Sequence, residues 1–490
     1  MLKKVLIANR GEIACRVIKS LKDMGIGSVA VFHHEDRAAP HVQMADESVQ
    51  LSGEVPTAAY LDQDQIIAVC KKTGADGVHP GYGFLSENAG FADTMTKAGI
   101  AFIGPNTDAI KLMGDKIESR EFASKHGIPI APSARQTGSL EDFIKDAEKI
   151  GFPLLIKASA GGGGKGMKIV HEKSELEESI RVAASEAERY FSDGRVYAEK
   201  LVEEPRHIEV QVLGDGKGNV VHLFERECSI QRRYQKVVEE SPAPNMAAKL
   251  RDEICDAAVR LTKAAKYKNA GTVEFILGAD GKFYFLEMNT RLQVEHPVTE
   301  MVVGVDLVAE QIKIASGEGL SFKQSDLKQT GHAIEVRICA ERPEKDYQPA
   351  TGRVGLMQVP TGPGIRFDGG IKEGQAVTPA FDSMLAKLIC YSATREEAVA
   401  SMENALGDFV LLGVPTNIDF LGRIMGNDVF KSGKLHTGFL TDQSEGLMPP
   451  ALSEDEEAAV ILTALLGDAD FRVSAFEVPE PYASIGSWHN

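Results

Sequence analysis

The chain has 490 residues, of which 43% are apolar and 26% charged, a composition typical of a soluble globular protein with two to four domains. Its net charge of −17 argues against nucleic acid or an anionic membrane as the main partner. A local cluster of lysines, glycine amides and a metal ion can nevertheless bind an anionic nucleotide.

The cysteines and the N-terminus point to a compartment. Six scattered cysteines without a C-x-x-C pair indicate reduced, structural thiols. The N-terminus, MLKKVLIANRGE, has too short an apolar run for a secretory signal and predicts a first strand. No run approaches the roughly 18 apolar residues of a membrane span. We therefore expect a cytoplasmic protein.

Residues 1–113 alternate strand and helix patterns, which predicts a parallel-sheet α/β domain. A dinucleotide-binding fold is disfavoured because the first turn, Asn9 to Glu12, lacks G-x-G-x-x-G. The loop HPGYGFLSEN (79–88) follows a strand's carboxyl end, where open α/β sheets bind ligands; a plain strand–helix turn is the alternative. The expected elements are strands at Lys4–Ala8, Ser28–His33, Gly74–His79 and Ala101–Gly104, and a helix at Glu12–Met24.

Four consecutive glycines separate two expected strands, Pro153–Ala158 and Lys168–Val170. Without a Cβ, such a backbone can lie against phosphates. The segment is not a Walker A loop, because no Ser or Thr follows its Gly-Lys pair and a strand comes next. A mobile lid over a nucleotide fits better than a floppy linker, since strands and lysines hold both ends.

The stretch from Gly271 to Pro297 predicts a metal site. Two apolar runs flank Asp280-Gly281, a strong signal for a hairpin with a two-residue turn. Such a turn sets Glu274 opposite Glu287, with Asn289 on the same face. Two carboxylates and an amide oxygen suit Mg²⁺. The alternative is a solvent face with two ordinary acids, but an unpaired charge inside the second apolar run would be unfavourable.

Charged residues on both sides of this hairpin predict an anion site. An expected strand at Arg206–Leu213 has His207, Glu209 and Gln211 on one face. A strand at Val220–Glu225 precedes the basic cluster QRRYQK (231–236), which otherwise is a solvated charge run. If the chain stays extended after residue 289, the metal face also carries three residues that suit proton transfer from a bound acid, Arg291, Gln293 and Glu295.

Residues 331–446 predict a β-rich α+β domain. A strand at Gly331–Ala340 has Glu335 and Arg337 on one face, and Ser453 with Glu456 forms a capping box for a helix ending near Gly467. The only tryptophan, Trp488, marks either a docking contact or a tail packed on its own domain. The other expected elements are strands at Gly352–Val359 and Ser383–Tyr391 and a helix at Arg395–Leu406. We assign domains to 1–113, 114–330 (lid about 131–203) and 331–446, with an extension at 447–490.

Five motifs resemble those of biotin carboxylase, a family of the ATP-grasp superfamily. They are KVLIANRGEIACRVI, VHPGYGFLSEN, KASAGGGGKGMKIV, ERECSIQRRYQKVVEESPAP and FLEMNTRLQVEHPVTE. The resemblance runs from residue 2 to about residue 445 and implies a parallel α/β N-terminal domain, an ATP-grasp domain with a mobile glycine-rich lid, and a β-rich C-terminal domain. It implies that ATP phosphorylates bicarbonate to carboxyphosphate, whose carboxyl group passes to N1 of biotin.

The resemblance also implies a role for each matching residue. Mg²⁺ or Mn²⁺ would bind to Glu274, Glu287 and Asn289, and bicarbonate would bind to Lys236, Arg291, Gln293 and Val294. Glu295 would be the base, with a raised proton affinity; Arg337 would stabilise the biotin enolate, and Tyr82 would contact its ureido ring. Tyr234, where many relatives have His, is left out. ATP would be held by Lys116, Lys157, Gly162, Gly163, Gly164, Met167, Glu199, Lys200, Val202, His207, Gln231 and Ile276.

The partners follow from the same resemblance. The chain lacks the Met-Lys-Met sequence expected around a biotinylated lysine, so biotin would reside on a separate carrier protein or domain. A biotin carboxyl carrier protein, a carboxyltransferase subunit and a second copy of the chain are the expected partners. We favour the biotin carboxylase subunit of an acyl-CoA carboxylase (acetyl- or propionyl-CoA type). Alternatives are a pyruvate carboxylase subunit, an ATP-grasp ligase for another carboxylate, and a catalytically silent nucleotide-binding subunit.

Overall fold

The computed structural model describes residues 1–490 except 137, 160–166, 450–452 and 468–490. The chain divides into two compact units, Met1–Leu447 and Met448–Asn490, and each is described by itself. The predicted phosphate-binding glycines (Gly162, Gly163 and Gly164) and Trp488 lie outside the described residues.

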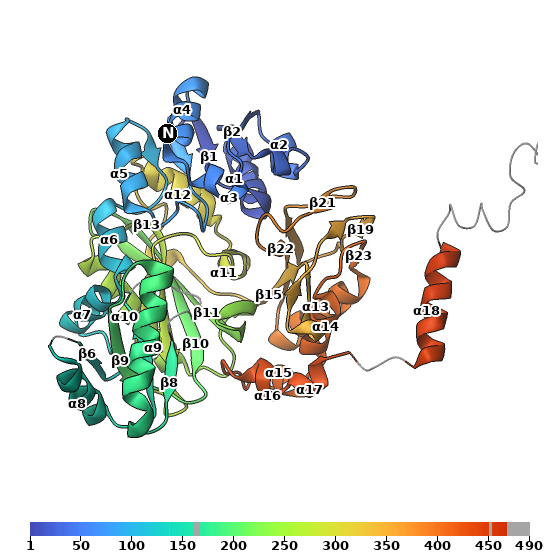
Figure 1. Ribbon diagram of the computed structural model, residues 1–490. Helices are drawn as coiled ribbons and strands as arrows, with labels where there is room; N and C mark the ends of the chain where they lie inside the picture. Colours follow the sequence, from blue (N-terminus) through green and yellow to red (C-terminus); the bar gives the residue numbers. More distant parts are fainter. Residues whose placement is uncertain (137, 160–166, 450–452, 468–490) are drawn as a thin grey trace, which may run out of the picture. The chain divides into compact units, whose positions relative to one another are not determined.

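The first unit begins with a five-stranded sheet whose strands are all parallel, as predicted (Figure 1). Its central strands are apolar on both faces, as helix-covered parallel strands require. The strands, in sheet order, are β3 (Glu47–Gln50), β2 (Gly27–Phe32), β1 (Lys4–Ile7), β4 (Gly77–His79) and β5 (Ala101–Phe102). The accompanying helices are α1 (Gly11–Asp23), α2 (Pro40–Met44), α3 (Pro56–Leu61), α4 (Gln63–Thr73), α5 (Ala89–Lys97) and α6 (Thr107–Gly114).

A four-stranded antiparallel sheet, at the lower left of Figure 1, flanks the glycine-rich segment on both sides. Its core is formed by apolar side chains of the strands and of two amphipathic helices. The strands, in sheet order, are β6 (Ser133–Arg135), β9 (Val196–Lys200), β7 (Leu154–Ala158) and β8 (Lys168–Val170). The helices are α8 (Leu140–Ile150) and α9 (Lys173–Phe191), and α7 (Lys116–Lys125) precedes them.

The largest sheet has eight antiparallel strands from both sides of the domain boundary predicted near residue 330. Alternate residues of β10 and β13, such as Ile208 and Val273, pack against α10, so the residues between them face the other way. The strands, in sheet order, are β14 (Phe283–Asn289), β13 (Lys268–Leu277), β10 (Arg206–Asp215), β11 (Val220–Arg232), β12 (Gln235–Ser241), β15 (His332–Cys339), β22 (Met384–Ser392) and β20 (Ile365–Gly369). The helices of this region are α10 (Ala248–Ala264), α11 (His296–Val303) and α12 (Leu307–Ala315).

The hairpin of β13 and β14 has the predicted pairing but a different turn. Glu274 lies opposite Glu287, as expected. The two-residue turn is wrong: Gly278 pairs with Lys282, and Gly281 adopts a φ of +76° at the end of a three-residue loop. A β-bulge next to Glu274 shifts the register by one residue and so restores the pairing of the two acids.

The basic cluster forms a second hairpin. β11 continues to Arg232, well beyond the predicted end at Glu225, and Arg232 pairs with Gln235 of β12. The two residues between them, Arg233 and Tyr234, both have positive φ (48° and 66°), which is the geometry of a type I′ turn. This tight turn brings Lys236 back over the polar face of the sheet.

The chain does not stay extended after β14, and that prediction is wrong. It turns between Thr290 and Glu295, and α11 begins at His296, followed at once by Pro297, a residue favoured in the first helical turn. A turn rather than a strand therefore presents Arg291, Gln293 and Glu295.

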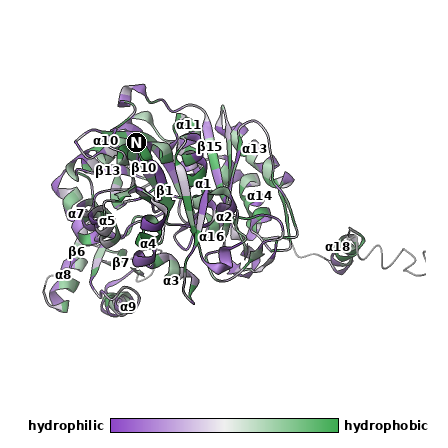
Figure 2. Ribbon diagram, turned by 90° about the horizontal axis from the view of Figure 1, so that it is seen from above, coloured by the Kyte–Doolittle hydropathy of each residue, from purple (hydrophilic) through white to green (hydrophobic). Residues whose placement is uncertain are grey.

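The C-terminal part of the first unit is β-rich with several helices, as predicted. The predicted strand at Gly352–Val359 is instead two short strands separated by a break. In Figure 2 the helices of this unit carry both hydrophilic and hydrophobic residues, as amphipathic helices covering a core do. The elements are β16 (Glu341–Arg342), β17 (Gln348–Pro349), β18 (Gly352–Arg353), β19 (Leu356–Gln358), β21 (Ala376–Val377), β23 (Val410–Leu412), α13 (Arg395–Asp408), α14 (Ile418–Gly426), α15 (Asp428–Lys431), α16 (Phe439–Asp442) and α17 (Ser444–Leu447).

The second unit contains α18 (Glu454–Gly467), which begins with the predicted capping box. The Ser453 hydroxyl accepts from the Glu456 N–H, and the Glu456 carboxylate accepts from the Ser453 N–H. Among the described residues, no helix has the length and apolar character needed to cross a membrane. The cytoplasmic location stays a prediction.

Candidate active site

A cavity of about 1230 Å³ lies over the polar face of the eight-stranded sheet. Every predicted site residue within the described part of the chain lines it, so the fold gathers residues spread over more than half of the sequence. Their individual roles remain predictions. They are Tyr82, Lys116, Lys157, Met167, Glu199, Lys200, Val202, His207, Gln231, Lys236, Glu274, Ile276, Glu287, Asn289, Arg291, Gln293, Val294, Glu295 and Arg337.

At one end of the cavity, each cation forms an ion pair with one carboxylate. Lys157 at the end of β7 and Arg120 of α7 both contact Glu199, at 2.9 and 3.0 Å. Burial raises the pKa of Glu199, but Lys157 and Arg120 outweigh it and the net pKa is lowered. Lys116 lies 3.0 Å from Glu287. Arg120 was not predicted, because its position within an ordinary helix carries no sequence signal.

Lys200 lines the same end, and its ammonium group is held by backbone carbonyls. It donates to the carbonyl oxygens of Gly151 and Phe152, at 3.2 and 2.6 Å. These carbonyls belong to the connection between α8 and β7.

The predicted metal ligands face the cavity and are held by cations. Glu274 accepts hydrogen bonds from Lys236, Asn289 and Gln293 at 2.9, 2.8 and 2.7 Å. Burial raises its pKa, but Lys236 and His207 dominate, so the pKa of Glu274 lies well below its ordinary value. Two ionised carboxylates with an adjacent amide oxygen fit a hard divalent cation, which would take over the charge balance that the lysines now provide.

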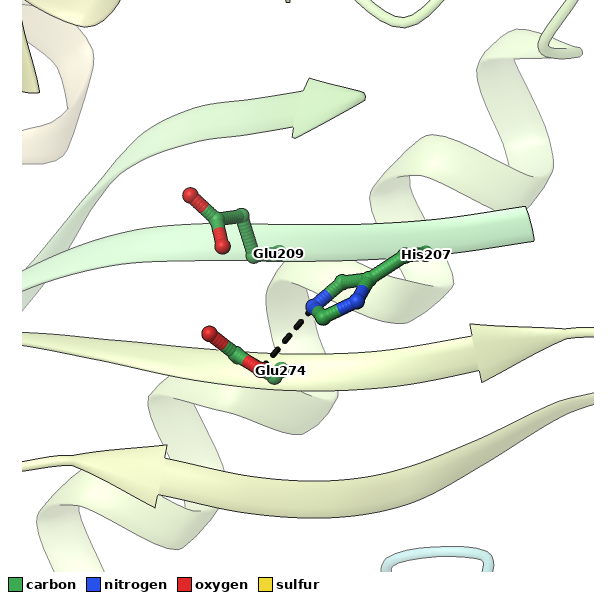
Figure 3. Close-up of side chains that lie close together, drawn as sticks. All are labelled: His207, Glu209 and Glu274. Carbon is green, nitrogen blue, oxygen red and sulfur yellow. Dashed lines mark ion pairs between the residues drawn. The ribbon is translucent and has the colours of Figure 1, made fainter. Parts of the chain in front are cut away.

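A second cluster of possible metal ligands shares Glu274. Figure 3 shows His207 and Glu209 on β10 next to Glu274 on β13, with an ion pair between His207 and Glu274 at 2.9 Å. Ligand atoms of the three residues lie within 4.8 Å of one another. Lys236 contacts both carboxylates, so its ammonium group already provides a cation there. Glu209 was on the predicted polar face of its strand but was not assigned to the site.

Lys236 joins the metal end of the cavity to the predicted base. Its ammonium group contacts three carboxylates, those of Glu209, Glu274 and Glu295, with the last at 2.6 Å. Burial lowers its pKa, but these carboxylates raise it well above the ordinary value for lysine. Lys236 therefore stays charged, and one cation balances part of three negative charges.

The prediction that Glu295 has a raised proton affinity is wrong, because the fold surrounds its carboxylate with cations. Burial raises its pKa, but Lys236, Arg337 and Arg226 together lower it far below the ordinary value. Glu295 accepts from Lys236 at 2.6 Å and from Arg337 at 2.9 Å. The carboxylate is thus ionised and able to accept a proton. Its proton affinity rises when a further anion interacts with these cations.

Arg337 connects Glu295 to two further buried carboxyls, one on β12 and one on β15. It also donates to Glu239 of β12 at 2.7 Å, and Glu239 lies opposite Glu335 of β15. Burial and the charge of Glu295 raise the pKa of Glu239 to about 7, although Arg337 lowers it. Glu335 is fully buried, and burial raises its pKa well above the ordinary value. The predicted strand pattern had placed Glu335 and Arg337 on one face, but not Glu239.

A buried arginine beneath the cavity, Arg226, was not predicted from the sequence. Arg226 of β11 is fully buried and donates to Glu209, Gln211 and Gln293, at 2.5, 2.8 and 3.0 Å, and to two threonine hydroxyls. It thereby fixes the side-chain amide of Gln293, which donates to Glu274. Arg226 lies one residue beyond the predicted strand Val220–Glu225, in the motif ERECSIQRRYQKVVEESPAP, and nothing in that pattern predicted its role.

The loop after β4 reaches the cavity through two side chains. The Tyr82 hydroxyl donates to Glu12, and Glu87 accepts from Arg291 at 3.0 Å. The expected location of this loop at a ligand site, rather than as a plain turn, agrees with its place in the cavity wall. Glu87 belongs to the motif HPGYGFLSEN, but its position in the sequence did not predict its contact with Arg291.

Comparison with known families divides the chain into three consecutive matches. Residues 1–110 match the biotin carboxylase N-terminal domain, residues 115–323 match the carbamoyl-phosphate synthase L chain ATP-binding domain, and residues 335–442 match the biotin carboxylase C-terminal domain.

Individual relatives agree with these matches. The chain is 47% identical to biotin carboxylase 1 of Bacillus subtilis, over 90% of this chain and 98% of that protein. It is 45% identical to the mitochondrial methylcrotonoyl-CoA carboxylase subunit alpha of Dictyostelium discoideum, over 99% of this chain and 70% of that protein. A solved structure, the biotin carboxylase domain dimer of Hydrogenobacter thermophilus 2-oxoglutarate carboxylase with MgADP, ADP and bicarbonate, is 44% identical with a TM-score of 0.89, covering 92% of this chain and 100% of that one.

These matches extend over nearly the whole chain, and the cavity contains the ionisable groups that an ATP-dependent carboxylation requires. The chain therefore belongs to the biotin carboxylase family, ATP-dependent ligases with an ATP-grasp fold.

Proposed function

We propose that this biotin carboxylase is the biotin carboxylase subunit of an acyl-CoA carboxylase of the acetyl- or propionyl-CoA type, acting on biotin attached to a separate carrier protein. The similarity of 99% of this chain to a methylcrotonoyl-CoA carboxylase subunit supports an acyl-CoA acceptor. The similarity to a 2-oxoglutarate carboxylase domain keeps a keto-acid acceptor, such as pyruvate, as the second candidate.

The observation that carries the chemical part is the position of Lys236. Its ammonium group contacts Glu274, a predicted metal ligand, and Glu295, the predicted base, at 2.9 and 2.6 Å. A small anion bound at Lys236 therefore lies within reach of both the metal-bound phosphate and the base. Such an arrangement favours phosphoryl transfer to a bound carboxylate-type anion.

The nucleotide occupies the end of the cavity with the singly paired cations. Lys116 and Lys157 take its phosphates, while Glu199, Val202 and Ile276 lie beside its base. His207 and Gln231, which are 3.4 Å apart, lie toward the ribose. A divalent ion held by Glu274, Glu287 and Asn289 supplies positive charge that offsets the charge developing on the transferred phosphoryl group.

Bicarbonate occupies the end around Lys236, Arg291, Gln293 and Val294. Glu295 takes the proton of bicarbonate while an oxygen of bicarbonate attacks the terminal phosphorus of ATP. The bond from that phosphorus to ADP breaks, which yields carboxyphosphate and ADP. Arg337 and Lys236 keep their places but also interact with the anionic substrate, so the proton affinity of Glu295 rises when it must accept a proton.

Biotin approaches on the side of Tyr82 and Arg337. The bond between phosphate and the carboxyl carbon of carboxyphosphate breaks, and the phosphate takes the N1 proton. This leaves an enolate-type oxygen on the ureido ring, and the permanent cation of Arg337 stabilises it. N1 then takes the carboxyl carbon. We also propose a homodimer, which the dimer of the Hydrogenobacter thermophilus domain supports and which size-exclusion chromatography with light scattering tests.

The test of the chemical part uses the purified chain and free biotin. ADP release should require both bicarbonate and Mg²⁺, stop when the divalent ion is chelated, and resume when Mg²⁺ or Mn²⁺ is added back. ADP release that ignores bicarbonate would indicate another carboxylate substrate, and a screen of carboxylic acids would then identify it.

The test of the acceptor uses the complex purified from the native cell through its biotinylated partner. Radiolabelled bicarbonate should be incorporated into acetyl-CoA or propionyl-CoA. Incorporation into pyruvate or 2-oxoglutarate instead would replace the acyl-CoA assignment while leaving the biotin carboxylase activity in place.

A further inference from the structure

Both peptide groups that flank Val294 are held by side chains outside the proposed bicarbonate site. The carbonyl of Gln293 faces His296, whose ring Nδ1 lies at 2.7 Å and whose backbone N–H lies at 3.4 Å. The carbonyl of Val294 accepts from the Lys387 ammonium group at 2.7 Å. Because both carbonyls are engaged, the orientation of the short turn before Glu295 is determined at two consecutive positions.

His296 has the protonation state that this arrangement needs. It is fully buried, and burial together with the nearby cations Lys387 and Arg16 lowers its pKa well below the ordinary value. The neutral ring has one N–H, and the carbonyl of Gln293 requires that it sit on Nδ1. The ring thus donates from Nδ1 to the Gln293 carbonyl.

The Val294 N–H is left without a partner in this turn. Within the part of the chain that the structure describes, no group accepts a hydrogen bond from it, although Val294 lines the cavity. An unpaired backbone N–H at a cavity wall is unfavourable unless water or a ligand accepts from it. A bound anion is a suitable acceptor, because a fixed N–H donor stabilises negative charge.

Lys387 occupies an unusual place for a lysine. It lies on β22, opposite Arg337 of β15, and its side chain is fully buried. Its other partner is Glu12 of α1, at 3.4 Å, and Glu12 in turn accepts from the Tyr82 hydroxyl. Three regions far apart in the sequence thus meet at one ammonium group: the first helix, the turn before α11 and the C-terminal strands. Removing a buried ammonium group from water is costly, and one ion pair at 3.4 Å offsets only part of that cost.

We infer that Lys387 is a positioning residue: its ammonium group, held by Glu12, fixes the peptide between Val294 and Glu295. That peptide directly follows the Gln293–Val294 peptide, which His296 holds and whose N–H faces bicarbonate. The contact of Lys387 also sets where Glu295 starts, and hence where its carboxylate meets Lys236 and Arg337. The inference rests on the proposed placement of bicarbonate at this end of the cavity. It also connects Tyr82, on the biotin side, to the turn that presents the base.

The variant Lys387→Met removes the charge and keeps most of the side-chain volume. Loss of a charge-assisted hydrogen bond to the turn should raise the KM for bicarbonate about tenfold, while the KM for ATP changes less than about twofold. Steady-state ADP release at varied bicarbonate and varied ATP measures both values. An unchanged KM for bicarbonate, or an equal rise in both KM values, would overturn the inference.

The matched control is Arg395→Met. Arg395 of α13 is a mostly buried cation that joins the C-terminal region to Glu240 of β12, at 2.7 Å, and does not touch the turn. The Arg395→Met variant should have a lower thermal unfolding midpoint than the wild type but an unchanged KM for bicarbonate. A rise in that KM in the control would show that any loosening of the C-terminal region has the same effect, and would also overturn the inference.

A second variant covers the case in which Lys387→Met does not fold. Glu12→Gln keeps an acceptor for the Tyr82 hydroxyl but removes the negative charge beside Lys387, so it should raise the KM for bicarbonate by a smaller factor. An unchanged KM for bicarbonate in this variant contradicts the inference. If the wild-type protein itself releases ADP without regard to bicarbonate, the proposed function fails, and that outcome is separate from either variant.

Discussion

The two ends of the cavity balance their charges in different ways. At the nucleotide end, Lys116 and Glu287 form a single pair whose side chains are 19% and 28% exposed. At the bicarbonate end, Lys236 is shared by three carboxylates, and all three are almost completely buried. The first pair can separate when a phosphate and a divalent ion arrive, each taking one partner. The second group is bound on several sides and is already in place.

This difference predicts that the two ends of the cavity contribute to different kinetic constants. Partners that exchange on binding contribute to affinity, because their interaction with the ligand replaces an existing ion pair. Groups that are held in place before the substrate arrives contribute to the rate, because no reorganisation is needed in the transition state. We therefore expect variants at the nucleotide end to change the KM for ATP, and variants of the reacting carboxylate at the bicarbonate end, Glu295, to change kcat.

The largest expected effect is that of Glu295→Gln. Loss of the proton acceptor should lower kcat about 100-fold or more, whereas binding of ATP, measured by calorimetry, should remain near the wild-type value. A parallel loss of ATP affinity would contradict both the role of Glu295 and the division between the two ends.

Glu335→Gln is the matched control for this variant. Glu335 is as deeply buried as Glu295, and because its pKa is raised, its carboxyl already resembles a neutral amide. The control should retain a kcat close to that of the wild type. A comparable loss in both variants would mean that any change of a buried carboxyl in this region disturbs catalysis.

The next effect is that of Lys157→Met at the nucleotide end. It removes one predicted phosphate contact and leaves Glu199 with Arg120 alone. The KM for ATP should rise about tenfold, with little change in the KM for bicarbonate. Lys168→Met serves as the control, because Lys168 of β8, in the same sheet, pairs with Glu186 of α9 at 2.9 Å and does not line the cavity. A fall in kcat at unchanged KM for ATP would contradict the expected difference between the nucleotide end and the bicarbonate end.

The smallest effect concerns the pH dependence of stability. In the folded state the pKa of Glu239 is raised from 4.5 to about 7, so its carboxyl keeps a proton that the unfolded chain releases. Its contribution to stability is complete below about pH 4.5 and is lost as the pH rises through about 7. The free energy of unfolding of the wild type, relative to Glu239→Gln, should therefore fall over this interval in denaturant titrations.

Glu199 at the nucleotide end sharpens this test. Its pKa is lowered, so its contribution to stability is present at neutral pH and is lost as the pH falls through its folded-state pKa. Glu199→Gln should accordingly reduce stability most at neutral pH. A difference that does not change with pH in the Glu239 variant would show that this carboxyl is ionised in the folded protein.

The hairpin shows how far local sequence rules reach. Asp280-Gly281 correctly predicted a hairpin and the opposition of Glu274 and Glu287, yet the turn has three residues and a bulge compensates for it. Turn type and bulges depend on how both strands pack in the eight-stranded sheet, so the local pattern alone does not determine them. The division of the chain after residue 330 is a further case, because β12 and β15 pair across it.

By itself, the sequence determined the elements with strong periodicity, the parallel N-terminal sheet, the capped helix α18 and, through its motifs, the members of the site. Only the tertiary structure showed that Arg226, Glu239 and Lys387 support that site, and that Glu295 begins as a stabilised carboxylate. The physical reason is that buried charges interact with whatever the fold places within a few ångströms. Those neighbours come from strands and helices far apart in the chain, where alternation and turn chemistry give no information about pairing.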